Sequence, residues 1–332
     1  MRIVSLLAVL SLLLSCSKGY IPETDPVPEG PEYDYIIDAN STYIAVFGDL
    51  QIYTNVPKAT AAFQRSIGWI YQQVEYYKNF SCVLHTGDIS DNNDPVQWKT
   101  FLDCMTPLTA KIPFYSCTGD HDYTWVEGKY VDNRYSTLFN SYVKFPSAVK
   151  NAVEFFEQGR MENVVIKNEI NGHSLNFLIL EFGPRKEVVD WAVEYVSTHP
   201  DEKFFVINHE YLEKGGGLRV SNLKCKARIR NSSYTTPTEL WNKLIKCNDN
   251  IVGVLCGHVG GLYNLTLTEN DFGREVPQIE HNIQEAAYQY DNWLMLWKFP
   301  KGDDNAYVSI YNTKTRKYWE NKEVLFKFKY KY

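Results

Sequence analysis

The sequence predicts an α/β fold built from parallel strands with helical crossovers. Two observations support this prediction: apolar strand-like runs alternate with helical patterns, and several of the runs end in short polar motifs that contain Gly, Asp or His. The chain has 332 residues, of which 44% are hydrophobic and 22% are charged. It is therefore long enough to bury a substantial core as one large domain, and its composition excludes a disordered chain.

The first half of the chain carries a regular alternation of strand and helix. We expect strands at residues 43–47, 82–85 and 112–117, and helices at 57–78 and 95–108. Strands separated by helices of this length favour parallel pairing, because the helix carries the chain back across the sheet.

The second half is less regular. Residues 123–171 are aromatic-rich without clear periodicity, which indicates loops or an insertion over one face. Beyond them we expect strands at 175–182, 204–208 and 252–256, and helices at 186–197 and 237–246. The C-terminal runs alternate in polarity and predict antiparallel strands at 293–299, 306–311 and 323–328.

The N-terminus, residues 1–15, predicts a lipoprotein signal peptide. An apolar run at residues 3–14 follows Arg2, and these twelve residues are too few to span a bilayer, which takes about 17–25. The ending Leu-Leu-Ser-Cys resembles a bacterial lipobox, in which Cys16 becomes the lipidated first residue. An ordinary signal peptide with an incidental Cys is the alternative. We expect an exported, membrane-anchored lipoprotein in the periplasm or on the cell surface, with the outer membrane as its membrane.

Residues 16–40 predict the lipidated Cys and a flexible tether, since they are rich in Pro, Glu and Asp and lack periodicity. The domain then occupies residues 41–332.

The charge of the chain limits its partners. The sequence has 34 Lys and Arg against 40 Asp and Glu, which give a net charge of −6, and no basic block is present. Duplex nucleic acid is therefore an unfavoured partner. The only membrane contact expected is the lipid anchor, and nothing indicates an obligate protein partner.

Cysteine spacing does not define a disulfide framework. Six cysteines remain beyond Cys16, and six allow 15 complete pairings. Cys82, Cys117 and Cys256 each fall in a strand-like apolar run, so we expect buried free thiols at these three positions.

Polar motifs follow five of the predicted strands. Because ligands bind beyond the carboxyl ends of parallel strands, the motifs should meet at one site. Asp and His are ligands of divalent metals, and the Gly residues allow sharp turns. The motifs are Gly48-Asp49-Leu50-Gln51, Gly87-Asp88-Ile89-Ser90-Asp91, Gly119-Asp120-His121-Asp122, Asn208-His209-Glu210 and Gly257-His258-Val259-Gly260-Gly261.

This set of motifs, in this order, resembles the calcineurin-like metallophosphoesterases. The resemblance covers about residues 41–312 and extends to segments such as Leu180-Glu181-Phe182-Gly183-Pro184 and Gln278 to Phe299, which look like the secreted bacterial branch of the family. It implies a four-layer α/β sandwich of two mixed β-sheets flanked by helices. It also implies two divalent metal ions, drawn from Mn, Mg, Fe and Zn.

Carried over by position, the resemblance assigns a role to each motif. Asp88 would bridge the two metals and Asp49 would bind the first. The second metal would be bound by Asp120, His209 and His258. His121 would donate a proton to the leaving oxygen or steady the phosphoryl charge. A bridging carboxylate would hold two cations about 3.5–4 Å apart, and their charge would convert a bridging water to hydroxide.

Three residues depart from the family pattern. Gln51 stands where the first His is usual, and it could be either a ligand or a bystander. Asp120 replaces Asn, a change that a divalent cation should tolerate. Gly260 replaces the second His of Gly-His-x-His and removes a ligand of the first metal. His281 could fill that place, but nothing in the sequence places it there, so we interpret it as structural. We therefore expect a weak or empty first site with oxygen donors that favour Mg or Mn.

These residues lead to one principal hypothesis and two alternatives. The principal one is an enzyme, a metallophosphoesterase that hydrolyses a small phosphomonoester or phosphodiester outside the cytoplasm. The first alternative is a catalytically degenerate lipoprotein that keeps the fold and binds a glycan or a partner at the cell surface. The second alternative is a purely structural lipoprotein without a ligand.

Overall fold

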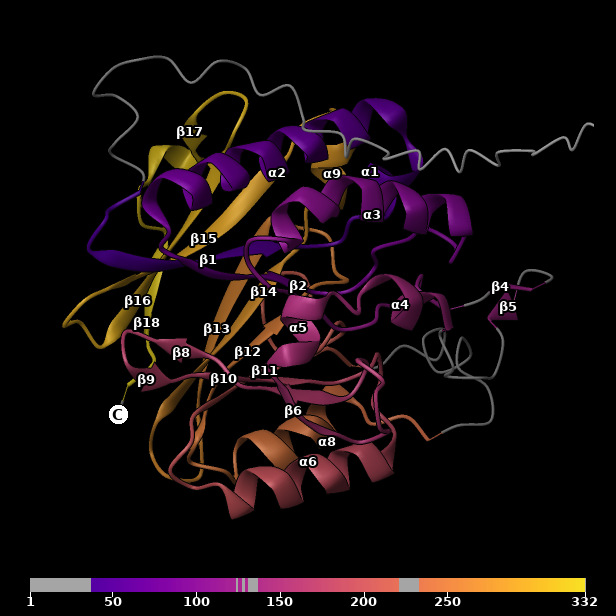
Figure 1. The fold of residues 1–332 in the computed structure, drawn as a ribbon. Helices are drawn as coiled ribbons and strands as arrows, with labels where there is room; N and C mark the ends of the chain where they lie inside the picture. Colours follow the sequence, from indigo (N-terminus) through magenta and orange to yellow (C-terminus); the bar gives the residue numbers. More distant parts are fainter. Residues whose placement is uncertain (1–36, 124, 127–128, 131–136, 221–232, 332) are drawn as a thin grey trace, which may run out of the picture.

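Two mixed β-sheets pack face to face, and helices cover their outer faces (Figure 1). The structure is a computed structural model, and it describes residues 37–123, 125–126, 129–130, 137–220 and 233–331. The expected four-layer α/β sandwich is confirmed. The predicted signal peptide, Cys16 and most of the tether lie outside the described residues.

The first sheet has seven strands in the order β17-β16-β15-β1-β2-β3, with β18 paired to β16. Its parallel part is β1, β2 and β3, and β15 runs antiparallel to β1. Strand β1 is nearly all buried and apolar, as expected for a central strand with both faces covered. The bounds are β1 Ser41–Phe47, β2 Phe80–His85, β3 Phe114–Ser116, β15 Trp293–Pro300, β16 Asn305–Asn312, β17 Lys317–Tyr318 and β18 Phe326–Lys329.

The second sheet also has seven strands, in the order β13-β14-β12-β11-β10-β7-β6. Its four central strands, β10, β11, β12 and β14, are parallel, and antiparallel strands flank them on both sides. The bounds are β6 Ala152–Phe155, β7 Val164–Ile166, β10 Asn176–Ile179, β11 Phe204–Ile207, β12 Ile251–Cys256, β13 Tyr263–Glu269 and β14 Glu275–His281.

Helices α2 and α3 cover one outer face, and α6 and α8 cover the other (Figure 1). The Asp94 carboxylate caps α3 by accepting from the Val96 amide, and a capping box formed by Thr236 and Glu239 begins α8. A π-helical turn at Trp241–Ile245 continues α8. The bounds are α1 Gln51–Asn55, α2 Pro57–Tyr77, α3 Pro95–Thr109, α6 Lys186–Thr198, α8 Pro237–Leu240 and α9 Gln284–Ala287.

The two sheets are joined by an aromatic core. Phe205 of β11 packs on Trp297 of β15, with ring centroids 4.9 Å apart, and on Phe328 of β18 at 5.6 Å. Tyr115 and Phe177 make a similar contact at 5.9 Å between β3 and β10. These contacts fix the relative placement of the two sets of strand ends that carry the polar motifs.

The expectation of loops across residues 123–171 is wrong in part. This segment contains short helices and the strands β6 and β7, which extend the second sheet, and a small hairpin, β8–β9. Strands of three or four residues are too short to display a period of two, so their pattern gave no signal. The other elements in the segment are α4 Thr137–Tyr142, α5 Pro146–Lys150, β4 Trp125–Val126, β5 Lys129–Tyr130 and β8 Glu169–Ile170, and the partner strand β9 His173–Ser174 follows directly after it.

The expected buried thiols are confirmed at Cys82, Cys117 and Cys256, and Cys104 is also buried and free. Cys225 lies outside the described residues.

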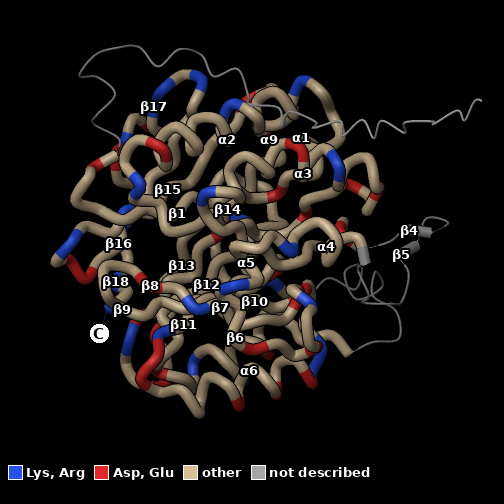
Figure 2. Tube along the Cα trace, viewed as in Figure 1, with Lys and Arg blue, Asp and Glu red and all other residues tan. Residues whose placement is uncertain are grey.

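Acidic and basic residues are interspersed over the described part of the chain (Figure 2). Within that part, no helix combines the length and the apolar character needed to cross a membrane.

Candidate metal centre

Five strands deliver polar side chains to one edge of the two-sheet core. Each residue lies two to four positions after a strand end, where parallel strands of both sheets finish together. Asp88 and Asp120 come from neighbouring strands of the first sheet, β2 and β3. His209 and His258 come from neighbouring strands of the second, β11 and β12. The predicted convergence of Asp88, Asp120, His209 and His258 is present in the structure.

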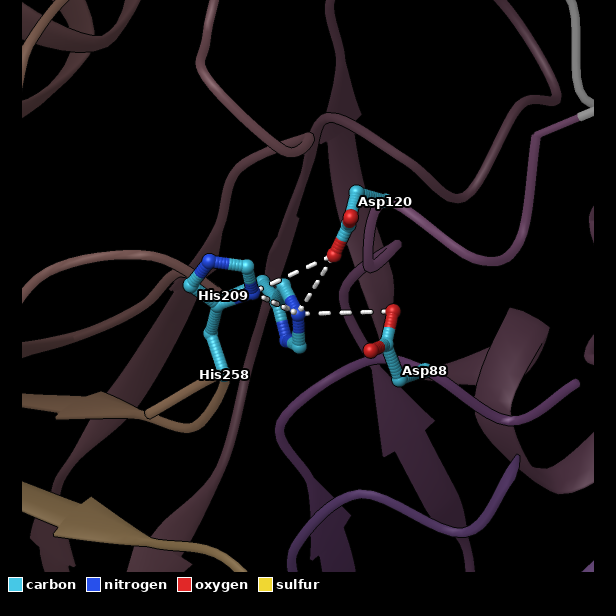
Figure 3. Close-up of side chains that lie close together, drawn as sticks. All are labelled: Asp88, Asp120, His209 and His258. Carbon is cyan, nitrogen blue, oxygen red and sulfur yellow. Dashed lines mark hydrogen bonds and ion pairs between the residues drawn. The ribbon is translucent and has the colours of Figure 1, made fainter. Parts of the chain in front are cut away.

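Three donor atoms of this cluster are spaced as metal ligands are. Asp120 Oδ1 lies 3.2 Å from His258 Nδ1 and 3.4 Å from His209 Nε2, and the two ring nitrogens are 3.2 Å apart (Figure 3). Donors held about 2.1 Å from a tetrahedral ion stand about 3.4 Å from one another. Asp88 Oδ1, at 3.3 Å from His209 Nε2, is the fourth donor. The residues present therefore fit a divalent cation.

The tautomer of His209 supports a ligand role. The ring is fully buried, and its Nδ1 lies 2.7 Å from the Thr86 carbonyl oxygen, to which it donates. Nε2 is then the nitrogen that faces Asp88 and Asp120, an orientation usual for a metal-binding His. Burial acts to lower the pKa of His209, but the carboxylates of Asp88 and Asp49 raise it well above its usual value. The same negative charge favours a divalent cation.

Asp88 lies at the middle of the site in a left-handed backbone conformation, with φ of 60°. Its Oδ1 accepts from the His121 amide at 3.0 Å, and its Oδ2 accepts from Gln51 Nε2 at 3.0 Å. Burial acts to raise the pKa of Asp88, but the charges of His209 and His121 lower it well below its usual range. Asp88 is therefore an ionised carboxylate with one oxygen on the His209 side and one on the Gln51 side.

Asp49 is buried beside this cluster. Its carboxylate accepts from Asn282 Nδ2 at 2.7 Å and from the His258 amide at 3.2 Å. Burial raises the pKa of Asp49 to about 6, although the charge of His209 acts in the opposite direction. The Asp49 carboxylate, which we expect to bind the first metal, is thus held in place by the side-chain amide of Asn282.

Gln51 begins α1 and is 1% exposed. Its Nε2 donates to Asp88, but its buried Oε1 has no hydrogen-bond partner within the described part of the chain. A buried carbonyl oxygen without a partner is costly, and a cation would satisfy it. This observation favours a ligand role for Gln51 over that of a bystander.

Asp122 is a structural residue of the site that the sequence reasoning missed. Its buried carboxylate accepts from the amides of Asp88 at 2.9 Å, Ser90 at 3.0 Å and Gly119 at 2.9 Å. Burial raises its pKa to about 7, and the charge of Asp88 adds to this increase. The sequence contained a signal for this residue, since Asp122 is the last residue of the Gly119-Asp120-His121-Asp122 motif. In the structure Asp122 joins the loop after β2 to the loop after β3.

His121 lies at the edge of the cluster and is partly exposed. Its Nδ1 lies 2.5 Å from the Asp91 carbonyl oxygen and 3.6 Å from the Asp91 carboxylate. Burial acts to lower the pKa of His121, but the Asp88 carboxylate and Asp91 raise it above the usual value. A protonated imidazole beside the candidate metal centre is suited to donate a proton.

His281 does not join the cluster. Its ring is buried, and Nδ1 lies 2.8 Å from the Leu262 carbonyl oxygen. Burial lowers the pKa of His281 to about 4, so the ring is neutral. The suggestion that His281 replaces the ligand missing at Gly260 gains no support from this arrangement.

A second polar group, also missed by the sequence reasoning, borders His258. Glu210 accepts from Arg219 Nε at 2.5 Å and from the Tyr234 hydroxyl, and it lies 3.9 Å from His258 Nε2. Glu280 of β14 is buried and accepts from Asn264, and burial raises its pKa to about 8. The side of the site formed by β12 and β14 therefore contains a carboxyl group that stays protonated at neutral pH.

The fold and the donor set define an α/β protein with a candidate divalent-metal centre. The chain matches the calcineurin-like phosphoesterase family over residues 42–261. It belongs to the calcineurin-like phosphoesterase family. This assignment confirms the family inferred from the five motifs.

The relatives by sequence are distant. An uncharacterised Bacillus subtilis protein, YvnB, is 25% identical over 270 residues, which make up 78% of this chain and 19% of that protein. A probable inactive purple acid phosphatase 9 of Arabidopsis thaliana is 28% identical over 93 residues, or 26% of this chain and 14% of that protein. The chain thus spans about a fifth or less of the length of these two relatives.

Two solved structures resemble the chain at low identity. A 5′-nucleotidase precursor from Thermus thermophilus has a TM-score of 0.44 and 13% identity, over 79% of this chain and 52% of that one. A protein serine/threonine phosphatase from Saccharomyces cerevisiae has a TM-score of 0.30 and 11% identity, over 77% of this chain and 73% of that one.

The buried Glu280 predicts a measurable pH dependence of stability. Its pKa of about 8 in the folded chain exceeds the value of about 4.3 usual for an unfolded one. Wild-type stability should therefore fall as pH rises from about 5 to 8, because only the unfolded chain releases the proton freely. Glu280→Gln removes this loss and should raise the free energy of unfolding by about 1–3 kcal/mol at pH 7.

Urea unfolding of metal-free protein at a series of pH values measures this effect. Glu269→Gln, an exposed change on the neighbouring strand β13, is the matched control and should leave the pH profile unchanged. Parallel profiles for Glu280→Gln and the wild type would contradict the assignment of a protonated Glu280.

Proposed function

We propose that the chain is a metal-dependent phosphoesterase that hydrolyses a small phosphomonoester or phosphodiester. The observation that carries this proposal is the spacing of 3.2–3.4 Å among the donor atoms of Asp120, His209 and His258, with Asp88 alongside. Family membership supports it. The cluster combines buried carboxylates with imidazole rings, which bind metal in their neutral form. This set of donors binds Mn, Fe or Zn.

The ligands divide between two cations. Asp120, His209 and His258 would hold the second metal, Asp88 would bridge, and Asp49 and Gln51 would contribute oxygen donors to the first. When bound, two such cations act as Lewis acids and lower the pKa of water to generate the attacking nucleophile. The first position should be the weaker one, since Gly260 offers no side chain.

The chain's own residues would complete the reaction. Asp122 fixes the loops that carry Asp88 and Asp120, so the carboxylates are oriented before substrate binds. His121, with its raised pKa and its Nδ1 fixed by the Asp91 carbonyl, would present Nε2 as the proton donor to the leaving oxygen. Hydrolysis then ends with that proton on the released alcohol.

Replacement of a cluster histidine tests the function. His209→Ala should lower hydrolysis of p-nitrophenyl phosphate and bis(p-nitrophenyl) phosphate by about 100-fold or more, because it removes a donor at the centre of the cluster. Metal content by elemental analysis should fall in parallel. His173→Ala, an exposed change in β9, is the matched control. Equal metal content in both variants would contradict the proposed ligand set.

A second change separates proton donation from metal binding. His121→Asn should lower kcat by about 10²–10⁴-fold, the usual contribution of a general acid, without a loss of bound metal. The loss should be smaller for p-nitrophenyl esters than for alkyl esters, because nitrophenolate leaves without a proton. An equal loss for both leaving groups would argue against His121 as the acid.

The proposed location is outside the cytoplasm, with the domain anchored through Cys16. The apolar run of twelve residues after Arg2 and the Leu-Leu-Ser-Cys ending support this part of the proposal. Cys16→Ser should abolish labelling of the expressed protein by a palmitate analogue and move the protein from the membrane fraction to the soluble fraction. Unchanged labelling would disprove lipidation at this residue.

A catalytically degenerate binding protein is the second candidate, favoured by Gly260 and by the replacement of His with Gln51. It would retain the cluster as a structural or ligand-binding centre. The substrate assay above distinguishes the two candidates. For an enzyme, the wild type hydrolyses the substrate and His209→Ala reduces this hydrolysis. For a binding protein, the wild type itself shows no hydrolysis.

A further inference from the structure

We propose that Glu285, on the short helix α9, supplies to the first metal position the ligand that Gly260 cannot supply. The proposal rests on the metal centre proposed above and extends its ligand set by a residue that lies 25 positions later in the chain. It would add one more oxygen donor to a site that has lost a ligand.

The first support is the space beside Gly260. A Cβ atom placed on Gly260 would lie 2.8 Å from Glu285 Oε1 and 3.6 Å from Glu285 Cδ. The carboxylate of Glu285 therefore occupies the volume in which a side chain at position 260 would begin. In a Gly-His-x-His pattern the second His would extend from that point, so the Glu285 carboxylate lies beside the position from which the missing ligand would reach.

The second support is the attachment of α9 to the site. Asn282 donates to Asp49 Oδ2 at 2.7 Å and accepts from the Gln284 amide at 2.8 Å. The Ile283 carbonyl accepts from the Tyr53 hydroxyl at 3.1 Å, and Tyr53 lies on α1 together with Gln51. The beginning of α9 is thus bound to the two segments that carry Asp49 and Gln51.

The third support is an unsatisfied donor set. Gln51 Oε1 is buried without a hydrogen-bond partner in the described part of the chain, and Gln51 Nε2 contacts Asp88. Asp49 and Asp88 are buried carboxylates, and Asp88 accepts from Gln51. With Glu285 the position would offer oxygen atoms only, and such a set suits Mn²⁺ or Mg²⁺ more than Zn²⁺.

The exposure of Glu285 offers a competing explanation, in which its carboxylate is only solvated and binds no metal. The residue is exposed and belongs to the first turn of α9, where an acidic side chain is common at a helix start. A purely solvated carboxylate would not affect metal binding. Measurements of metal stoichiometry and affinity therefore distinguish the two roles without any assay of activity.

The experiment compares full-length wild type, Glu285→Gln and the control Glu169→Gln, an exposed change in β8. Equilibrium dialysis against Mn²⁺ gives the number of ions bound and both dissociation constants, and electron paramagnetic resonance detects a coupled Mn pair. We expect two ions in the wild type and the control. In Glu285→Gln the weaker ion should bind at least about tenfold less tightly, with loss of the coupled signal.

A rescue variant completes the test. Gly260→His combined with Glu285→Ala should restore the second ion, because the imidazole can then occupy the volume vacated by the shortened side chain. One ion in the wild type, or equal affinities in the wild type and Glu285→Gln, would overturn the role of Glu285 and leave the proposed function standing. No bound ion in the wild type would overturn both proposals.

Discussion

The carboxylate of Asp122 is the interaction on which the arrangement of the site depends. It accepts from backbone amides in the loop after β2 and in the loop after β3, so one buried side chain joins two strand ends. The close approach requires glycine: a Cβ on Gly119 would lie 2.3 Å from the Asp88 amide nitrogen. Asp88 and Asp120 keep their spacing because these loops touch backbone to backbone.

The histidines are positioned by a different means. His209 and His258 follow adjacent strands of the second sheet, and His209 is fixed by its bond to the carbonyl of Thr86, the residue directly after β2 of the first sheet. Phe182 packs against both imidazole rings, with centroid distances of 5.9 Å and 6.0 Å. The centre therefore spans the joint between the sheets, and any relative movement of the sheets would change its ligand distances.

Much of this arrangement could be predicted from the sequence, because long buried strands and strand-end motifs each leave a local pattern. The family resemblance and the cluster of Asp88, Asp120, His209 and His258 follow from such patterns, and the paired sheets follow from what that resemblance implies. Strands β6 and β7 were missed because they are too short to show periodicity. Strands β13 and β14 were not among the predicted strands either. The contact of Glu285 with Gly260 joins distant segments, and no local pattern encodes it.

The buried cysteines have a consequence for biogenesis under the proposed export of the chain. Cys82, Cys104 and Cys117 are buried and unpaired, and burial raises the pKa of each thiol. Since disulfide exchange requires an accessible thiolate, folded chains of this kind resist enzymes that introduce disulfides in oxidising compartments. On the proposed export route, the thiols are accessible only in the interval before the core closes, so rapid folding after translocation would protect them from mispairing.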